Sequence, residues 1–381
     1  MNNLPLVFSD EWLFFTQRFA QHFSLLLRYF SQKSSNFVGS LIELMKRISQ
    51  RDIARQLGVN VSTVSRALRG LDGVSPELKQ QIEKLAEDAG YRPNPFALSL
   101  RYDTTRTIGI VVPDVSFNQY AHIVKCIEAE ARNAGYMCII TDTDDTYENE
   151  VNCLEMLMNM HVEGIIICLS QDTVDFRHLK QLKKAHMPVV LFDRAPDVDI
   201  SSVIINDAAS AREATNSLID SGARRIAFLG GPNQQKQMTD RKHGYLEALR
   251  ERGIPIRTEL VKSHHISFNS GLSDTLDLLR LPEPPDAILA THGLLAISAL
   301  QALTNSGKRI PDDVAVVGYM SDWVSEMSHP RISFVRQNLR EIGCKAFRLL
   351  LDQMNGDDSV QHIVVKARLE LRDSTKALRA K

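Results

Sequence analysis

Between residues 46 and 90, apolar and polar positions recur with the period of an α-helix and are interrupted by capping residues. Ser49 is placed to cap a first helix, with an acidic residue three positions later as in a capping box, and Gly58 can end that helix. Asn60 is placed to cap a second helix, and Ser75, which precedes a proline, begins a third. Three short helices joined in this order predict a helix-turn-helix domain.

From residue 108 onward the pattern changes to short, continuously apolar runs that alternate with amphipathic helices. Typical runs are "IGIVV", "MCIIT", "GIIICL" and "VAVVGY". Runs of this kind are typical of parallel strands that are covered on both faces. They predict a doubly wound α/β body of about 270 residues, which is large enough for two lobes. The stretch "YRPNPFALSLRYDTTRT" between the two patterns contains prolines and a polar tail and is predicted to be a linker with one short helix.

The first 44 residues have a different character from the rest of the chain. Residues 12–30, "WLFFTQRFAQHFSLLLRYF", are rich in apolar side chains, but charged and histidine side chains interrupt them before they reach the length of a membrane helix. They also make a poor signal peptide. We interpret this segment as an amphipathic tail or the product of an upstream start before Met45. The alternative is a helix that binds a membrane surface or a partner.

Charge is distributed unevenly along a chain whose formal net charge is −1. Residues 45–102 contain ten Lys and Arg against six Asp and Glu, whereas residues 103–381 have a net charge of −5. A basic module joined to an acidic body fits a polyanion contact at one end of the chain. The five cysteines are odd in number and lack CxxC spacing, which indicates reduced thiols in a cytoplasmic protein. They are Cys126, Cys138, Cys153, Cys168 and Cys344.

The second predicted helix carries the residue types that read DNA. Its first residues, Asn60, Val61, Ser62 and Thr63, are small or polar and would let the helix approach base edges in the major groove. Arg66, one turn later, can bind a guanine through two hydrogen bonds. Residues placed to contact phosphates are Ser49, Gln50, Ser65 and Arg69. The alternative is a core helical hairpin with a solvated polar face.

Specific motifs make the chain resemble the lactose-repressor (LacI-type) family of bacterial transcription regulators. The strongest are "RDIARQLGVNVSTVSRALRG", "VSPELKQQIEKLAEDAGYRPN" and "IGIVVPD". Further matches are "FDR" at 192–194, "GARRIAFLGGP" at 222–232, "DRKHGYLEAL" at 240–249 and "IPDDVAVVGY" at 310–319. The resemblance covers residues 46–372.

The resemblance implies a homodimeric repressor or activator that binds pseudopalindromic operator DNA. It implies that a hinge helix in the linker folds on the operator, with Leu100 wedged into the minor groove and Ala97 facing the partner helix. It divides the chain into an extra N-terminal segment (1–44), a helix-turn-helix domain (45–91), a linker with the hinge helix (92–106), a two-lobed α/β effector-binding and dimerisation domain similar to periplasmic binding proteins (107–375), and a tail (376–381).

Polar and aromatic residues at the carboxyl ends of strands predict an effector cleft between the two lobes. They are Phe117, Asn118, Asp193, Arg241, Phe268, His292 and Gln337, and all match positions where the family holds its effector. Their chemistry suits a sugar or sugar derivative. Two departures weaken the acceptors for sugar hydroxyls, because His292–Gly293 and Met320 replace the family's usual polar and acidic residues. A partly anionic or larger effector is therefore also considered, with Arg241 as its anchor and His292 as a donor that titrates near neutral pH.

Enzyme motifs and metal-binding spacings are missing from the sequence. "GGP" at 230–232 lacks the lysine and hydroxyl residue of a phosphate-binding loop, and neither GxGxxG, GxSxG nor HExxH occurs where those sites need it. We therefore expect no enzyme activity, no cofactor and no metal. The alternative function is a sugar-binding protein with the periplasmic-binding-protein fold and no DNA function.

Overall fold

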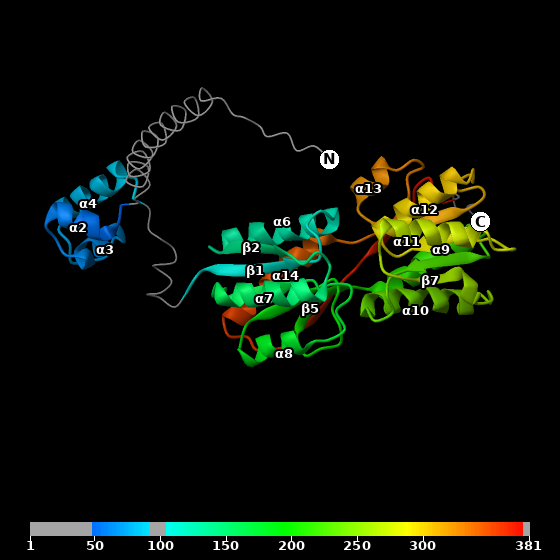
Figure 1. Cartoon of the computed structure of the whole chain (residues 1–381), viewed down its shortest axis with the longest axis horizontal. Helices are drawn as coiled ribbons and strands as arrows, with labels where there is room; N and C mark the ends of the chain where they lie inside the picture. The colour runs from blue at the N-terminus through cyan, green and yellow to red at the C-terminus, as the bar shows by residue number, and fades with distance from the viewer. Residues whose placement is uncertain (1–47, 92–103, 376–381) are drawn as a thin grey trace, which may run out of the picture. The chain divides into compact units, whose positions relative to one another are not determined.

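A computed structural model of the chain describes residues 48–91 and 104–375, which belong to two separate compact units (Figure 1). The predictions for the N-terminal segment, the hinge helix with Ala97 and Leu100, and the tail lie outside the described residues. The three-helix and two-lobed α/β architecture predicted from the sequence is confirmed.

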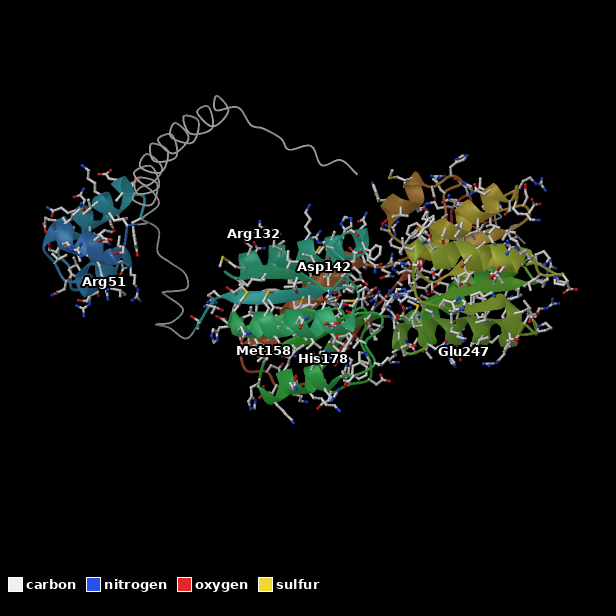
Figure 2. The ribbon with its side chains drawn as sticks, in the orientation of Figure 1. Arg51, Arg132, Asp142, Met158, His178 and Glu247 are labelled. Atoms are coloured by element: carbon white, nitrogen blue, oxygen red, sulfur yellow. The ribbon has the colours of Figure 1, made fainter. Side chains whose placement is uncertain are left out.

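The first unit is a three-helix domain composed of α2 (Gln50–Leu57), α3 (Val61–Leu68) and α4 (Pro76–Asp88). Ser49 caps α2 in a complete capping box, and Gly58 ends it with a φ of 65°, a left-handed conformation that favours glycine. Each helix contributes to one small core of apolar side chains, which includes Ile53, Val64 and Ile82. Arg51 projects from its outer surface (Figure 2).

The first lobe of the second unit has a six-stranded parallel sheet in the order β11-β5-β4-β3-β1-β2. Its strands are β1 (Thr107–Val112), β2 (Met137–Asp142), β3 (Gly164–Ile167), β4 (Val189–Phe192), β5 (Ser201–Ile205) and β11 (His362–Val365). Its helices are α6 (Asn118–Asn133), α7 (Tyr147–Asn159), α8 (Arg177–Lys184) and α14 (Leu339–Met354).

The second lobe repeats this plan with the strand order β12-β10-β9-β8-β6-β7, in which only β12 is antiparallel to its neighbour among the described strands. Its strands are β6 (Ile226–Gly230), β7 (Val261–Ser263), β8 (Ala287–Ala290), β9 (Ala315–Met320), β10 (Ser333–Arg336) and β12 (Arg368–Glu370). Its helices are α9 (Asp207–Asp220), α10 (Lys236–Glu251), α11 (Phe268–Leu279), α12 (Gly293–Asn305) and α13 (Asp322–Met327), with a short 3₁₀ turn (Thr258–Leu260) before β7.

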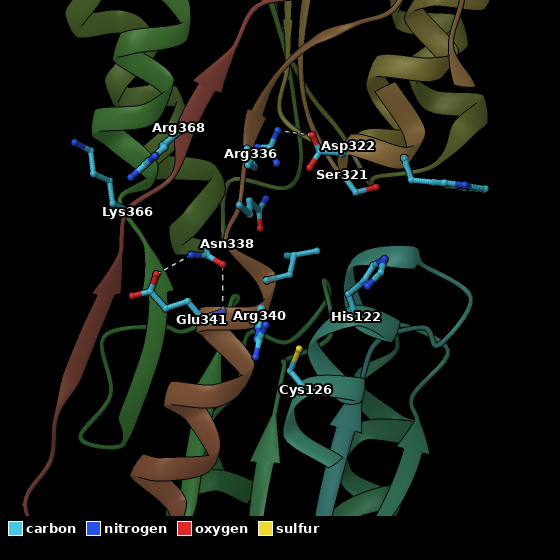
Figure 3. Close-up of a pocket in the computed structure, with 13 residues that line it drawn as sticks. His122, Cys126, Ser321, Asp322, Arg336, Asn338, Arg340, Glu341, Lys366 and Arg368 are labelled. Atoms are coloured by element: carbon cyan, nitrogen blue, oxygen red, sulfur yellow. Dashed lines mark hydrogen bonds and ion pairs between the residues drawn. The ribbon is translucent and has the colours of Figure 1, made fainter. Parts of the chain in front are cut away.

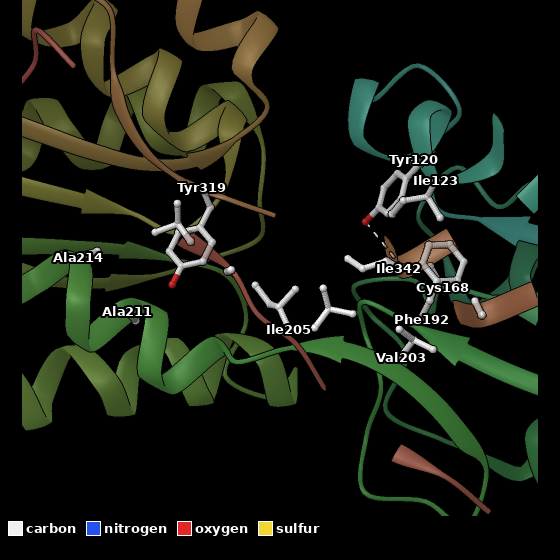
Figure 4. Packing of buried hydrophobic residues seen from close by; sticks show 14 of the residues in the cluster. Tyr120, Ile123, Cys168, Phe192, Val203, Ile205, Ala211, Ala214, Tyr319 and Ile342 are labelled. Atoms are coloured by element: carbon white, nitrogen blue, oxygen red, sulfur yellow. Dashed lines mark hydrogen bonds between the residues drawn. The ribbon is translucent and has the colours of Figure 1, made fainter. Parts of the chain in front are cut away.

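The chain passes between the lobes three times, from β5 to α9, from β10 to α14 and from β11 to β12. The first and third crossovers are tied together, because the side-chain oxygen of Asn206 accepts a hydrogen bond of 2.7 Å from the backbone N–H of Ala367. Buried apolar residues extend through both lobes, from Phe192 and Ile342 in the first to Ala211 and Tyr319 in the second (Figure 4). The crossovers therefore place the carboxyl ends of two sheets opposite each other.

Candidate functional site

The outward face of α3 carries most of the residues predicted to read DNA. Val61, Ser62 and Arg66 are exposed, and Thr63 is half-buried. Asn60 occupies the N-cap position, but its side chain makes no capping hydrogen bond, and the residue is exposed. These side chains form one continuous polar and apolar surface at the N-terminal end of the helix, which is the end that a recognition helix presents to base edges.

Ser65 borders the buried side of α3, and its predicted phosphate contact stays a prediction. The residue is only 5% exposed, beside Val64 and Ala67 in the core of the three-helix domain. The helical period explains this burial, because Ser65 directly follows Val64 and lies three positions before Leu68, which packs against the same core. Arg69, at the C-cap, remains exposed and keeps the predicted role as a proposal.

The residues placed at the start of α2 are held by local hydrogen bonds. The Ser49 hydroxyl donates to the Asp52 carboxylate over 2.6 Å, and the Asp52 backbone N–H donates back to the Ser49 oxygen over 3.3 Å. Ser49 and Gln50 are both half-buried. This capping box fixes the position of the helix N-terminus, which is itself a favourable site for a phosphate.

Between the lobes, Arg241 organises a buried cluster of charged residues. Its Nε donates to Asp207 over 2.6 Å, and one terminal nitrogen donates to the backbone oxygen of Thr291 over 2.5 Å. The guanidinium also lies 4.0 Å from the ring centroid of Tyr319, a cation–π distance. Gly244, three residues later in α10, lets this helix pack close enough to α9 for Arg241 to reach Asp207. A Cβ at position 244 would lie 2.0 Å from the Ala208 backbone oxygen of α9.

Two carboxylates of this cluster are buried against cations. Burial raises the pKa of Asp193, and the positive charges of Arg241 and then Arg194 oppose that increase. Burial likewise raises the pKa of Asp207 to about 6, although its ion pair with Arg241 acts in the other direction. Asp193 also has a φ of 59°, an unusual backbone conformation for a residue with a side chain. Strained, buried ionisable residues of this kind concentrate at functional sites.

His292 does not titrate near neutral pH, so that expectation was wrong. Burial, together with the nearby charges of Arg194 and Arg241, lowers the pKa of His292 to about 3. The imidazole is therefore neutral at physiological pH. Its Nδ1 accepts a hydrogen bond of 3.2 Å from the backbone N–H of Leu294, which leaves the proton on Nε2. His292 can still donate a hydrogen bond, but it does so as a neutral imidazole through Nε2.

Contacts from the first lobe close over this cluster. The Phe117 ring meets the His292 ring edge-on, with 5.7 Å between their centroids. The Gln171 side-chain oxygen accepts a hydrogen bond of 2.9 Å from the backbone N–H of Ile266 in the second lobe. Arg194 is held by Asp145 in a 2.5 Å ion pair. The adjoining cavity measures about 20 Å³, which is room for about one water molecule.

Three residues that line this cavity have buried polar atoms without a hydrogen-bond partner among the described residues. These atoms are Nε of Arg194, both amide atoms of Gln235 and the amide oxygen of Gln237. Nε2 of His292, which lies in the field of Arg194, is a further unpaired atom. Buried polar atoms are nearly always paired, so a group of orphans in one place indicates that another molecule completes their bonding. The group supplies both donors and acceptors.

Of the remaining predicted effector residues, Gln337 lines another cavity, and the roles of Asn118 and Phe268 stay predictions. Asn118 and Phe268 are half-buried at the first positions of α6 and α11. Gln337 lines a different, larger cavity on the side of the crossovers. The residues that sequence reasoning missed also follow strands or begin helices, which is the signal that could have found them. They are Asp145, Gln171, Arg194, Asp207, Gln235, Gln237 and Thr291.

Comparisons with known proteins agree with this architecture. The family model "Bacterial regulatory proteins, lacI family" matches residues 50–94, and "Periplasmic binding protein-like domain" matches residues 215–375. Catabolite control protein A of Priestia megaterium is 33% identical over 328 residues, which cover 85% of this chain and 98% of that protein. The chain belongs to the lacI family of bacterial regulatory proteins.

One solved structure supports the same assignment, and a second shares the fold. The transcriptional regulator CelR in complex with cellobiose has a TM-score of 0.66 and 30% identity over 86% of this chain and 100% of that one. The lac repressor dimer bound to operator and the anti-inducer ONPF shares the fold, with a TM-score of 0.78 and 24% identity over 87% of this chain and 100% of that one. This lacI-family chain is thus a DNA-binding transcription regulator controlled by an effector, and it is not an enzyme. The alternative of a sugar-binding protein without DNA function is excluded by the match to residues 50–94.

Across the described residues, no helix is long and apolar enough to span a membrane.

Proposed function

We propose that this regulator acts in the cytoplasm as a homodimer on pseudopalindromic operator DNA, and that a neutral, hydroxyl-rich molecule between its lobes sets operator affinity. The observation that carries the effector proposal is the group of orphaned polar atoms around His292 and Gln235. Sugar hydroxyls both donate and accept hydrogen bonds, and would satisfy such a mixed group.

The charges of the cleft favour a neutral effector over an anionic one. Asp145 pairs with Arg194 and Asp207 with Arg241, and Asp193 lies in the field of the same two cations. Lys236, which lines the cavity, pairs with Asp240. The charge of Arg241 is therefore already neutralised by Asp207. Arg241 would position Asp207 and the end of β8 at Thr291, and would not neutralise an anionic effector. The relative CelR was solved with cellobiose, which is a neutral sugar.

A sugar-sized effector requires the lobes to separate, because the present cavity is only about 20 Å³. Effector binding would thus select a more open arrangement of the lobes. The family resemblance supports a hinge role for Ala97 and Leu100, through which lobe movement would alter minor-groove contact. Coupling between effector and operator must then be reciprocal.

Exposed apolar side chains support the homodimer. Met137 and Ile140 lie on the edge strand β2 and are 55% and 45% exposed, while Met156 and Met160 project from the adjacent α7. A second group on α13 includes Trp323, at 59% exposed, and Met327. Apolar groups of this kind, next to an unpaired strand edge, mark surfaces that a partner covers.

The DNA proposal is tested by Arg66→Ala on an operator selected from random sequences. We expect specific affinity to fall by about 1–3 kcal/mol while affinity for random DNA changes much less, because Arg66 would contact a base rather than a phosphate. Fluorescence anisotropy at one fixed salt concentration measures both. An equal loss on both DNAs would assign Arg66 to the backbone.

The effector proposal is tested by Gln235→Leu, because neither amide atom of Gln235 makes a hydrogen bond in the structure. Removing unpaired buried polar atoms should leave stability unchanged or slightly raise it. The thermal shift produced by a sugar or nucleoside that stabilises the wild type should be lost. Gln171→Leu is the matched control, since its amide joins the lobes and its loss should destabilise the protein. An unchanged ligand response in Gln235→Leu would place the effector elsewhere.

A further inference from the structure

A cavity of about 710 Å³ opens between the two lobes beside their crossovers (Figure 3). The first lobe contributes His122 and Cys126 from α6, and the second contributes Ser321 and Asp322 from the end of β9. The second lobe also contributes Trp323 from α13, and two crossovers supply the rest of the lining, residues 336–341 together with Lys366 and Arg368. Its volume is within the range of small-molecule sites, in contrast to the nearly filled cleft around Arg241.

Cations in this cavity exceed the carboxylates that could neutralise them. Arg336, Arg340, Lys366 and Arg368 line it, against the carboxylates of Asp322 and Glu341. Glu341 is already engaged, by Asn338 at 2.8 Å and by Lys345 at 2.7 Å.

The strand register places two of these cations directly opposite each other. Arg336 of β10 pairs with Arg368 of the antiparallel β12, so both side chains leave the same face of the sheet. Arg336 is compensated by Asp322 at 2.5 Å and by Glu370 at 3.2 Å. Within the described ranges, neither Arg368 nor Lys366 has an ion pair, and both are exposed. Like charges in opposite register are destabilising, and the positive charge that stays without an ion pair here is that of Arg368 and Lys366.

The other groups at the cavity suit an anion with a polar body. Figure 3 shows Lys366 and Arg368 at one end of the cavity, Arg336 beside Asp322 and Ser321, and His122 toward the other end. The Ser321 hydroxyl oxygen is buried without a hydrogen-bond partner among the described residues. Arginine side chains bind phosphate and carboxylate groups through paired, charge-assisted hydrogen bonds.

We propose that this cavity is a second ligand site, distinct from the effector cleft, that binds a small oxyanion-bearing metabolite through Arg368, Lys366 and Arg336. The ligand carries a phosphate or carboxylate group and a hydroxylated body that reaches Ser321. Two of the three crossovers form the walls, so an occupant contacts the segments about which the lobes turn. Its binding would bias the lobe angle and, if the proposed effector function holds, alter effector affinity reciprocally.

The test measures binding to the full-length protein by calorimetry and thermal shift at constant ionic strength. The probes are inorganic phosphate, ribose 5-phosphate, citrate and uncharged ribose. We expect saturable binding of at least one anion and none of ribose. The anion that binds most tightly identifies the source of the oxyanion, whether free phosphate, phosphate ester or carboxylate.

The double variant Arg368→Ala/Lys366→Ala should lose at least about 10-fold in anion affinity, since it removes the charge-assisted hydrogen bonds of both cations to the ligand. Arg368→Lys should lose an intermediate amount of anion affinity, because it keeps the charge but not the paired donors.

Lys308→Ala is the control, an exposed cation that does not line the cavity. Gln235→Leu should bind the anion normally, which separates this site from the effector cleft. Unchanged affinity in the double variant, or anion effects that follow ionic strength alone, would overturn the proposal.

Discussion

The two polar regions between the lobes differ in how their charges are balanced. In the buried cluster, Arg241 is matched by Asp207, and Arg194 by Asp145, with side chains almost removed from solvent. In the cavity beside the crossovers, Arg336 is matched, but Lys366 and Arg368 remain exposed and without an ion pair among the described residues.

This difference follows from the free energy of burying charge. An uncompensated charge inside a protein costs several kcal/mol, so the buried cluster forms only with its ion pairs complete. At the open cavity, water stabilises the unmatched cations, and a ligand can replace that water. The first region therefore contributes strongly to folding, whereas the second is expected to contribute mainly to binding.

Arg241→Ala should have the largest effect on stability. The variant leaves Asp207 buried without its cation, and we expect a loss of about 3–5 kcal/mol at pH 7, measured by urea unfolding. Burial already raises the pKa of Asp207 to about 6. Below that pH, protonation of Asp207 should reduce the difference in unfolding free energy between the variant and the wild type.

A matched double variant, Arg241→Met with Asp207→Leu, removes both charges and should recover most of this stability. A loss below about 1 kcal/mol in Arg241→Ala would contradict the contrast between the two regions, because surface ion pairs typically contribute no more than that.

His292→Gln should change the pH dependence of stability. The folded-state pKa of His292 is about 3, below its value of 6.5 in a model peptide, so the unfolded chain binds a proton more readily. Stability from this residue is complete above about pH 6.5 and is lost as pH falls toward 3. The wild type should lose about 2 kcal/mol between pH 7 and pH 5 from this source alone.

Asp207 acts in the opposite direction over part of the same range. Its raised pKa of about 6 means that the folded state gains a proton, and stability, as pH falls from 6 toward 4. The comparison of His292→Gln with wild type isolates the histidine contribution. Parallel curves of unfolding free energy against pH for the two proteins would show that the pKa of His292 does not differ between the folded and unfolded states.

The sequence predicted the helices, the two lobes and part of the buried cluster, because these depend on local patterns. Hydrophobic runs located the strands, and polar residues after them located Asp193, Arg241 and His292. It could not show that Asp207 would neutralise Arg241, since that pair joins residues 34 positions apart. For the same reason it misjudged the titration of His292, whose burial depends on Phe117 from the other lobe.

The positive site beside the crossovers was beyond sequence reasoning for a related reason. Arg336 and Arg368 become neighbours only through an antiparallel register between β10 and the last described strand. The sequence identified Gln337 as a possible effector ligand, and the structure places it in the lining of this cavity.

Arg368→Ala should have the smallest effect on stability and gives the sharpest contrast with Arg241→Ala. In the absence of added anion we expect a change within about 0.5 kcal/mol, because the side chain is exposed and makes no ion pair with the described residues. Removing one of two opposed like charges could even stabilise the pairing of β10 with β12. Salt screens that repulsion, so raising NaCl from low concentration to about 0.5 M should stabilise the wild type more than the variant. Equal salt dependence of the urea midpoints would mean that Arg336 and Arg368 are already neutralised, and the contrast between the two regions would then be lost.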